Sequence, residues 1–260
     1  MIIPLYIIDA FTSTRFRGNP AAVCPLDAWL DDAVMQNIAA ENNLAETAFL
    51  VKQDDSWNLR WFTPTMEIEL CGHATLASAF MLALEFPDKK EFRFHTLSGE
   101  LTVTKSDELY TLDFPARALL GVQLNQLISA CLGVDVLEVT RAGKTLIAEL
   151  ENEETVRNLV PDFANIKTLD CSGLIITARG DDCDFVSRFF APRLGINEDP
   201  VTGSTHCGLI PYWQRRLEKK VMVARQLSPR GGELQCELKG DRVLIGGNAV
   251  LFMHGTIFLT

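Results

Sequence analysis

The sequence predicts an α/β (α+β) protein of two similar halves, each a curved, barrel-like, mostly antiparallel sheet around a central helix. Two observations lead to this fold class. A set of landmarks occurs twice, in the same order, along the 260 residues. In each copy a cluster of small and polar residues precedes a helix candidate, and the first of these, Ala74–Leu84, is apolar on every side. Such a helix must be covered all round, which flanking strands can do by wrapping it.

Four landmarks define the repeat, and the intervals between them agree to within about three residues. The first copy contains Arg60–Pro64, Cys71–Thr75, Ser98–Leu101 and Asp107–Leu112, and the second contains Arg188–Pro192, Thr202–His206, Gly231–Leu234 and Asp241–Ile245. Convergent strand-turn-helix patterns are the alternative explanation. Agreement of four landmarks in sequence favours a true duplication, and therefore a cleft between two halves.

The first half is predicted to contain an amphipathic helix from Asp27 to Asn42, with Leu30, Val34 and Ile38 on one face. Strands are predicted around this helix and around the apolar one, over residues 1–9, 21–24, 46–51, 59–62, 92–103 and 109–114. A boundary near Phe114–Ala116 divides the chain into residues 1–115 and 116–260. The last strand can pack on either half.

The second half is predicted to open with a helix over 124–132 and two strands joined by Ala142–Lys144. A short helix over 156–159 and strands over 173–178 and 185–190 follow. The helix after Gly203 contains Pro211, so we expect it to kink or break there. Strands from Gln226, Glu233 and Val243 complete this half.

Composition excludes several classes of function. A net charge of −10 argues against nucleic acid as a partner, and the basic run over 215–220 is typical of a solvated helix end. Seven scattered cysteines without a C-x-x-C pair indicate reduced thiols in the cytoplasm, and the four histidines lack metal-site spacing. The longest apolar stretch is well short of the ~20 residues that span a membrane, and the N-terminus reads as a strand, not as a signal peptide. We therefore expect a soluble protein with no metal and no membrane partner.

Gly72 and Gly203 each stand just before a helix candidate, where backbone N–H groups and the helix dipole attract an anion. Either glycine can also be explained as a tight strand-to-helix turn. Because both clusters are expected to line one cleft, the duplication favours a shared site for a substrate carboxylate.

The two copies differ where chemistry is expected. Superposition places Cys71 opposite Thr202 and His73 opposite Ser204. A racemase that needs a base on each face of one carbon would place a thiol in both clusters, and a threonine hydroxyl is too weak an acid to serve. The sequence therefore favours a proton shift that uses one base.

Glu46 is the best candidate for that base, because a carboxylate in an apolar setting can take and return a proton near neutral pH. A structural role at a helix-to-strand corner is the alternative. Asp199 can hold a substrate amine or hydroxyl or orient His73, or it can organise the turn before Pro200. His73 can act as an acid or a hydrogen-bond donor, or be structural.

These residues resemble the PhzF family of phenazine biosynthesis-like isomerases, which share the diaminopimelate epimerase-like fold. Five segments carry the resemblance: Asp9–Phe11, Gly18–Val23, Glu46–Phe49, Cys71–Thr75, and Glu198–Ser204 with His206. The resemblance implies a cofactor-free homodimer in which Glu46 moves the proton. It also implies that His73, Asp199 and Ser204 surround the substrate and that the Gly72 and Gly203 loops hold its carboxylate. Thr205 stands where many members have Ala.

The leading hypothesis is a cofactor-independent isomerase that moves a proton and a double bond in a small carboxylic or amino acid, resembling trans-2,3-dihydro-3-hydroxyanthranilate isomerase. No residue identifies the substrate ring. One alternative is an amino-acid racemase, epimerase or dehydratase that uses Cys71 as a base. Another is a module that binds a carboxylated metabolite without converting it.

Overall fold

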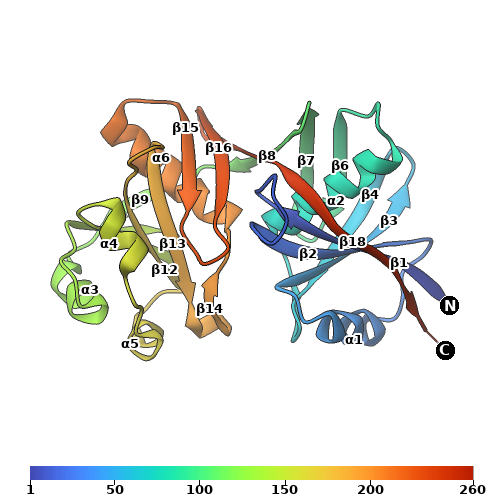
Figure 1. Ribbon diagram of the computed structural model, residues 1–260, viewed down its shortest axis with the longest axis horizontal. Helices are drawn as coiled ribbons and strands as arrows, with labels where there is room; N and C mark the ends of the chain where they lie inside the picture. The colour runs from blue at the N-terminus through green and yellow to red at the C-terminus, as the bar shows by residue number, and fades with distance from the viewer. Residues whose placement is uncertain (260) are drawn as a thin grey trace. The chain divides into compact units, whose positions relative to one another are not determined.

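The computed structural model describes residues 1–259, which form two compact units (Figure 1). The first unit contains Met1–Asp113 together with the chain from Gly246 on, and the second contains Phe114–Ile245. Strand β18 (Ala249–Phe258) pairs antiparallel with β1 (Ile2–Ala10) along the length of β1. The C-terminal strand, which the sequence left open to either half, therefore completes the sheet of the first unit.

The first unit wraps its sheet around one helix. Its remaining elements are β2 (Asn19–Leu26), α1 (Asp32–Asn42), β3 (Glu46–Gln53), β4 (Ser56–Phe62), β5 (Glu67–Ile68), α2 (Gly72–Glu85), β6 (Glu91–Thr96), β7 (Gly99–Ser106) and β8 (Leu109–Pro115). Helix α2 contacts β1, β2, β3, β7 and β18, and all its residues except Phe80, Leu84 and Glu85 are buried. The apolar segment is therefore the central helix that the sequence predicted.

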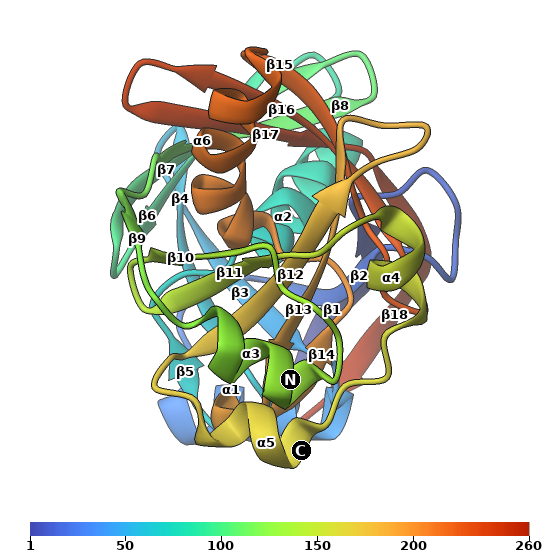
Figure 2. The ribbon, with the colours of Figure 1, turned by 90° about the vertical axis from the view of Figure 1, so that its left-hand side faces the viewer.

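The second unit places helices on both faces of its sheet (Figure 2). Its elements are β9 (Leu119–Gly121), α3 (Asn125–Leu132), β10 (Glu138–Ala142), β11 (Thr145–Glu149), α4 (Glu153–Asn158), α5 (Phe163–Thr168), β12 (Gly173–Arg179), β13 (Phe185–Ala191), η1 (Pro192–Leu194), β14 (Ile196–Asp199), η2 (Gly203–Thr205), α6 (His206–Leu217), β15 (Val221–Gln226), β16 (Gly232–Lys239) and β17 (Arg242–Gly247). Ile176 of β12 packs in one core with α3, α4 and α5. The neighbouring Thr177 accepts a hydrogen bond from Trp213 of α6. Successive side chains of β12 point to opposite faces of the sheet, so α3, α4 and α5 cover one face and α6 covers the other.

The strands of the two units pair in the same order. In the first unit, β1 pairs antiparallel with β2, β2 parallel with β3, β3 antiparallel with β4, and β4 with β5 (antiparallel) and β6 (parallel). In the second unit, β10 to β15 repeat these five pairings with the same directions. The sixth pairing is antiparallel in both units and joins β6 with β7 in the first and β15 with β16 in the second. The repeated landmarks therefore belong to a repeated topology.

The register shows which residues correspond. Ala21 of β2 is opposite Glu46 of β3, and Thr145 of β11 is opposite Gly173 of β12. Gly173 is thus the counterpart of Glu46. By the same registers, Trp61 corresponds to Phe189 and Ile68 to Asp199.

An arginine–glutamate pair joins the corresponding hairpins of each unit. Arg60 Nε and Nη2 donate to Glu67 of β5, both at 2.7 Å. Arg188 Nε and Nη2 donate to Glu198 of β14 at 2.7 and 2.9 Å. Each glutamate lies four residues before the residue that caps the next helix, Cys71 or Thr202. The same bidentate arginine–glutamate pair therefore fixes, in each unit, the strand that leads to the helix cap.

Three local predictions are wrong. Residues 92–103, predicted as one strand, form the hairpin of β6 and β7, because the chain turns at 97–98 and Thr96 pairs with Gly99. Helix α1 begins at Asp32, five residues later than expected, because the carbonyl of Asp31 accepts the first helical hydrogen bonds from Val34 and Met35. Leu30 therefore precedes the helix. Helix α6 continues through Pro211 without a break. Proline removes the N–H that would bond to the Cys207 carbonyl, and the backbone N–H of Arg117 takes that place at 2.8 Å.

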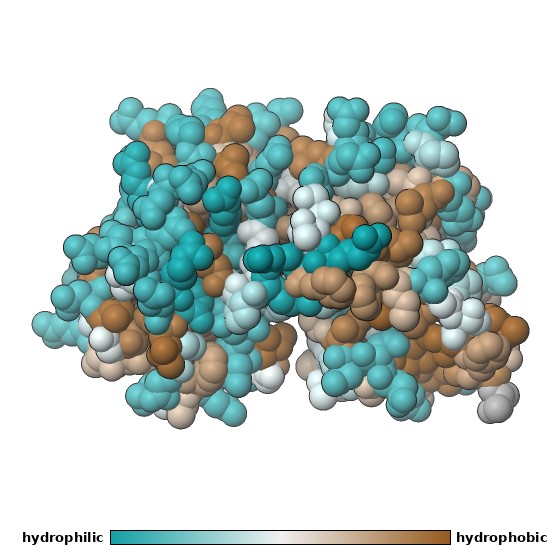
Figure 3. Space-filling model, in the orientation of Figure 1, coloured by the Kyte–Doolittle hydropathy of each residue, from teal (hydrophilic) through white to brown (hydrophobic). Residues whose placement is uncertain are grey.

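Large apolar side chains are exposed where β1 and β18 meet: Ile2 pairs with Phe258, and Met1 precedes β1. Hydrophobic side chains gather on this part of the first unit's surface in Figure 3. The homodimer implied by the resemblance stays a prediction. No helix within residues 1–259 combines the length and apolar character needed to cross a membrane.

Candidate active site

Glu46, Cys71 and His73 form a buried cluster in the first unit. The distance from Glu46 Oε2 to His73 Nε2 is 3.1 Å, and the distance from Cys71 Sγ to His73 Nδ1 is 3.5 Å. The amide nitrogen of Asn19 lies 3.2 Å from the same Nδ1. These four residues are each at most 7% exposed. One imidazole therefore connects a carboxylate, a thiol and an amide away from solvent.

The fold brings these residues together from three elements. Glu46 begins β3, which lies parallel to β2, and Asn19 begins β2. Cys71 caps α2 with extended backbone angles, φ −144° and ψ 109°, and His73 stands in the first helical turn. Because α2 packs on β2 and β3, its first turn meets the starts of both strands. Gly72, in the same turn, is also buried.

Electrostatics within the cluster favour a charged imidazole. Burial alone lowers the pKa of His73, but Cys71 and Glu46 offset this effect and hold that pKa well above its ordinary value. Burial raises the pKa of the Cys71 thiol, and the Glu46 carboxylate raises it further. Glu46 raises the pKa of both groups, so its carboxylate favours the proton on the His73 ring as well as the proton on the thiol.

We expect the His73 ring to titrate above about pH 6.5, the ordinary value for histidine. Replacement by Glu46→Gln removes the carboxylate and should lower the pKa of His73. Nitrogen-15 NMR of the histidine rings between pH 4 and 9 would measure both values. His206 serves as an internal control, since burial lowers its pKa to about 4. A His73 pKa at or below 6.5 in the wild type would contradict this interpretation.

The raised pKa also predicts how stability depends on pH. The folded state binds the His73 proton more tightly than the unfolded state does, so the stabilisation is complete below about pH 6.5 and is lost as pH rises through the folded pKa. Urea unfolding at several pH values should show this loss in the wild type and a smaller one in Glu46→Gln. Equal pH dependence in the two proteins would count against the pairing.

The same three residues offer metal-ligand atoms. The ligand atoms of Glu46, Cys71 and His73 lie within 4.8 Å of one another. A carboxylate, a thiolate and an imidazole can hold a divalent ion of the zinc type, although thiolate formation must overcome the raised pKa of Cys71. The metal-free site expected from the sequence stays a prediction.

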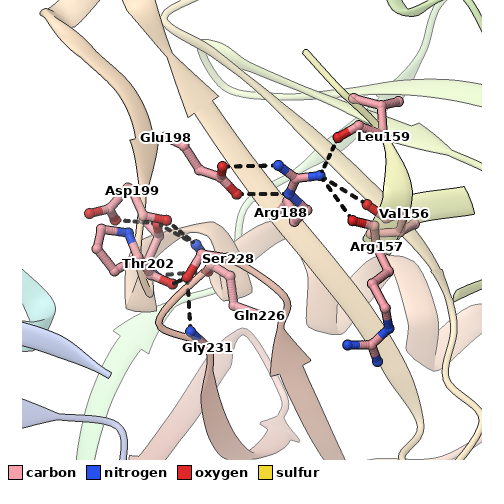
Figure 4. A network of polar contacts seen from close by, with 11 residues as sticks. Val156, Arg157, Leu159, Arg188, Glu198, Asp199, Thr202, Gln226, Ser228 and Gly231 are labelled. Atoms are coloured by element: carbon pink, nitrogen blue, oxygen red, sulfur yellow. Dashed lines mark hydrogen bonds and ion pairs between the residues drawn. The ribbon is translucent and has the colours of Figure 1, made fainter. Parts of the chain in front are cut away.

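A second polar cluster lies in the second unit around Asp199 (Figure 4). Thr202 Oγ1 donates to Asp199 Oδ2, and Gln226 Nε2 donates to the Asp199 carbonyl at 2.7 Å. Gln226 Oε1 accepts from the Thr202 backbone N–H at 2.9 Å. Ser228 Oγ donates to the Pro200 carbonyl at 2.7 Å and accepts from the Gly231 N–H at 3.0 Å. Two strand ends therefore clamp the segment that carries Asp199 and Thr202.

Thr202 caps η2 with extended angles, as Cys71 caps α2. Gly203 is buried and Ser204 is half-buried in the turn that follows. His206 is uncharged at neutral pH, and its Nδ1 lies 3.0 Å from the Thr202 carbonyl. His206 therefore stabilises the turn and is not a candidate acid.

The structure thus groups the predicted site residues into two sets. Glu46, Cys71, Gly72 and His73 gather in the first unit, and Asp199, Thr202, Gly203 and Ser204 gather in the second. The cleft predicted between the halves stays a prediction.

Sequence reasoning missed two contributors to these sets. Asn19 belongs to the Gly18–Val23 segment of the resemblance, so the motif contained a signal for it. Gln226 lies 24 residues beyond Thr202 with no motif around it, and only the fold reveals its contact.

Comparisons with known proteins agree with this architecture. The chain matches the PhzC-PhzF family, described as phenazine biosynthesis-like protein, over residues 8–255. An uncharacterized isomerase of Pseudomonas aeruginosa is 47% identical over 260 residues, which cover 100% of both chains. The crystal structure of a PhzF-family phenazine biosynthesis protein from Enterococcus faecalis is similar with a TM-score of 0.96 at 51% identity, and the match covers 100% of both chains.

A more distant structure shares the fold alone. The hydroxyproline epimerase of Agrobacterium vitis has a TM-score of 0.60 at 11% identity, with 98% of this chain and 92% of that chain covered. The predicted fold class is therefore confirmed. On the identity over its whole length and on the family match, this chain belongs to the PhzF family of phenazine biosynthesis-like proteins and is an isomerase of that family.

Proposed function

We propose that the protein is a cofactor-independent isomerase that moves a proton, and with it a double bond, within a small carboxylic or amino acid. The observation that carries the proposal is the buried contact of 3.1 Å between Glu46 Oε2 and His73 Nε2. It places a carboxylate beside a protonatable ring and away from solvent, and these are side chains that general acid–base catalysis uses.

In the proposed reaction, Glu46 removes a proton from a carbon next to an unsaturated system. The C–H electron pair becomes the new double bond, and the electron pair of the old double bond moves to the far carbon. The Glu46 carboxyl group then delivers the same proton to the far carbon, so that no oxidant or reductant is consumed. The His73 imidazolium, 3.1 Å away, positions Glu46, which is a carboxylate before the first transfer, carries the proton between the two transfers, and is a carboxylate again afterwards.

The remaining residues are proposed to bind the substrate. The backbone N–H groups of the Gly72 and Gly203 turns suit a carboxylate. Asp199 and Ser204 suit an amine or hydroxyl substituent on the same molecule. This part of the proposal requires the two residue sets to act on one substrate.

The comparison of the two units supports a single acid/base. Gly173 stands at the register position of Glu46, and a Cβ there would lie 2.4 Å from Phe189 Cε2. The second unit therefore has no carboxylate at the corresponding place. Two-base inversion, the mechanism of a racemase, lacks its second base on this reading.

The competing racemase or dehydratase hypothesis requires Cys71 as the base. The contact of Cys71 Sγ with His73 Nδ1 at 3.5 Å is the observation that favours it. Its raised pKa argues against a thiolate at neutral pH. We expect Cys71→Ser to retain activity within about tenfold of wild type, because the serine keeps a small polar group at the helix cap. A loss as large as that of Glu46→Gln would favour the rival mechanism.

Deuterium incorporation tests the proposed function. The protein is incubated in D2O with dihydro-hydroxyanthranilates and related unsaturated amino acids, and mass spectrometry and proton NMR follow the label. Wild-type protein should place deuterium on carbon and move the double bond in at least one acid. Tight binding without exchange in any acid of the panel would favour a binding module instead.

A further inference from the structure

A hollow of about 630 Å³ lies in the second unit, with Arg117, Lys144, Phe189 and Ser204 among its lining residues. A neighbouring hollow of about 410 Å³ shares Lys144 and adds Arg141 and Arg193. Ser172 lines both hollows, and its Oγ donates to the Lys144 carbonyl at 3.0 Å, which fixes the turn between β10 and β11. Because the two hollows share Gly143, Lys144, Ser172 and Leu194, they adjoin, and together they are named the basic groove.

The cations of this groove are held by neutral oxygen atoms. Arg117 Nη1 lies 3.3 Å from Thr145 Oγ1, Arg141 Nη2 lies 3.1 Å from the Asp170 carbonyl, and Arg193 Nη1 lies 2.8 Å from the Leu169 carbonyl.

Other cations of the second unit do form ion pairs. Arg188, Arg216 and Lys219 all pair with carboxylates. Within residues 1–259, none of the groove's four cations forms an ion pair, and Asp170 is the single acid of its lining. In a chain of net charge −10, four such cations concentrate positive potential in one place.

The groove begins at the place in the second unit that corresponds to the Glu46 cluster of the first. Thr145, beside Gly173, matches Ala21, beside Glu46. Phe189 matches Trp61, and Ser204 matches His73 in the repeated cluster. Where the first unit has an acid/base, the second unit has a glycine without space for a side chain, and basic residues around a hollow. The position that corresponds to Glu46 therefore carries no titratable side chain and lies beside a hollow with basic lining residues.

We infer that the groove, through Arg117, Lys144 and Ser204, binds a second anionic group of the substrate. The substrate class is then an acid with two anionic groups, either a dicarboxylate or a phosphate ester. A guanidinium fork and an ammonium group suit both chemistries, and the serine hydroxyl adds a hydrogen bond. The inference rests on the proposed function, because it assigns the anion to the isomerase substrate.

Direct binding tests the groove without turnover. Inorganic phosphate is titrated by calorimetry into the wild type, the double variant Arg117→Gln/Lys144→Gln, and Arg215→Gln, a matched change of an exposed arginine on α6. Wild type and Arg215→Gln should bind phosphate saturably, and added salt should weaken binding. The double variant should bind at least about tenfold more weakly. Equal phosphate affinity in the double variant, or no saturable binding to the wild type, overturns the inference.

A second arm separates this inference from the proposed function. Phosphate binding to Glu46→Gln should equal that of the wild type, whether or not any exchange is observed. In the D2O assay, dicarboxylic and phosphorylated acids are compared with their singly charged amides or alcohols. Faster exchange of the doubly charged member, lost in the double variant and kept in Arg215→Gln, supports the assignment. Equal exchange rates for both members of each pair overturn it.

Discussion

The Glu46→Gln variant should lose isomerase activity by about 10²–10⁴-fold, the usual contribution of a positioned general acid or base. The amide keeps the size of the side chain and its place beside His73, but it cannot accept a proton from carbon. The effect should appear in kcat more than in KM, since Glu46 is proposed to act on the reacting proton. Deuterium incorporation and double-bond migration in D2O measure the loss.

Glu41→Gln provides the matched control for this prediction. Glu41 lies on the exposed surface near the end of α1 in the same unit, and its replacement should leave the rate unchanged. Thermal unfolding of both variants would verify that they are folded. Deuterium uptake in Glu46→Gln at the wild-type rate would remove Glu46 from the mechanism.

The Arg188→Met variant should lose about 3 kcal/mol in the free energy of unfolding. Arg188 is 7% exposed and forms two hydrogen bonds to Glu198, and its Nη1 also donates to the carbonyls of Leu159 at 2.6 Å and Val156 at 3.2 Å. Methionine fills much of the volume but leaves a half-buried carboxylate and three carbonyls, including that of Arg157 at 3.5 Å, without these donors. Urea unfolding followed by fluorescence measures the change.

The repeat supplies the control for Arg188. Arg60→Met breaks the corresponding pair in the first unit, where the side chains of Arg60 and Glu67 are 21% and 26% exposed. Solvent screens this pair more, so we expect about 1 kcal/mol or less. The double variant Arg188→Met/Glu198→Gln should recover part of the lost stability, because it removes the stranded charge. Equal losses in Arg188→Met and Arg60→Met would contradict the argument from burial.

Local patterns in the sequence were sufficient for much of the fold. The Ala74–Leu84 segment, with apolar residues on every side, had to be a covered helix, and it forms most of α2. The Pro211 helix shows the limit of such reasoning. A proline breaks a helix only when the released carbonyl has no other partner, and the partner here, the N–H of Arg117, comes from a distant segment.

In the candidate site, too, the sequence identified the residues, and the fold determined their contacts. The residue types and motifs identified Glu46, Cys71 and His73, because their chemistry is visible in the sequence. Their contacts depend on β2 and β3 lying parallel with α2 across their starts, which no local pattern encodes. Gln226 had no motif and became visible only through its bonds to Thr202 and Asp199.

The sequence by itself determined that the chain is duplicated, that the two copies differ at Cys71 and Thr202, and that one carboxylate is the best base. Only the tertiary structure decided that Gly173 is the counterpart of Glu46 and that four cations share one groove. The physical reason is that composition and periodicity are properties of neighbouring residues. Strand register and the gathering of charges depend instead on segments that meet only after the chain has folded.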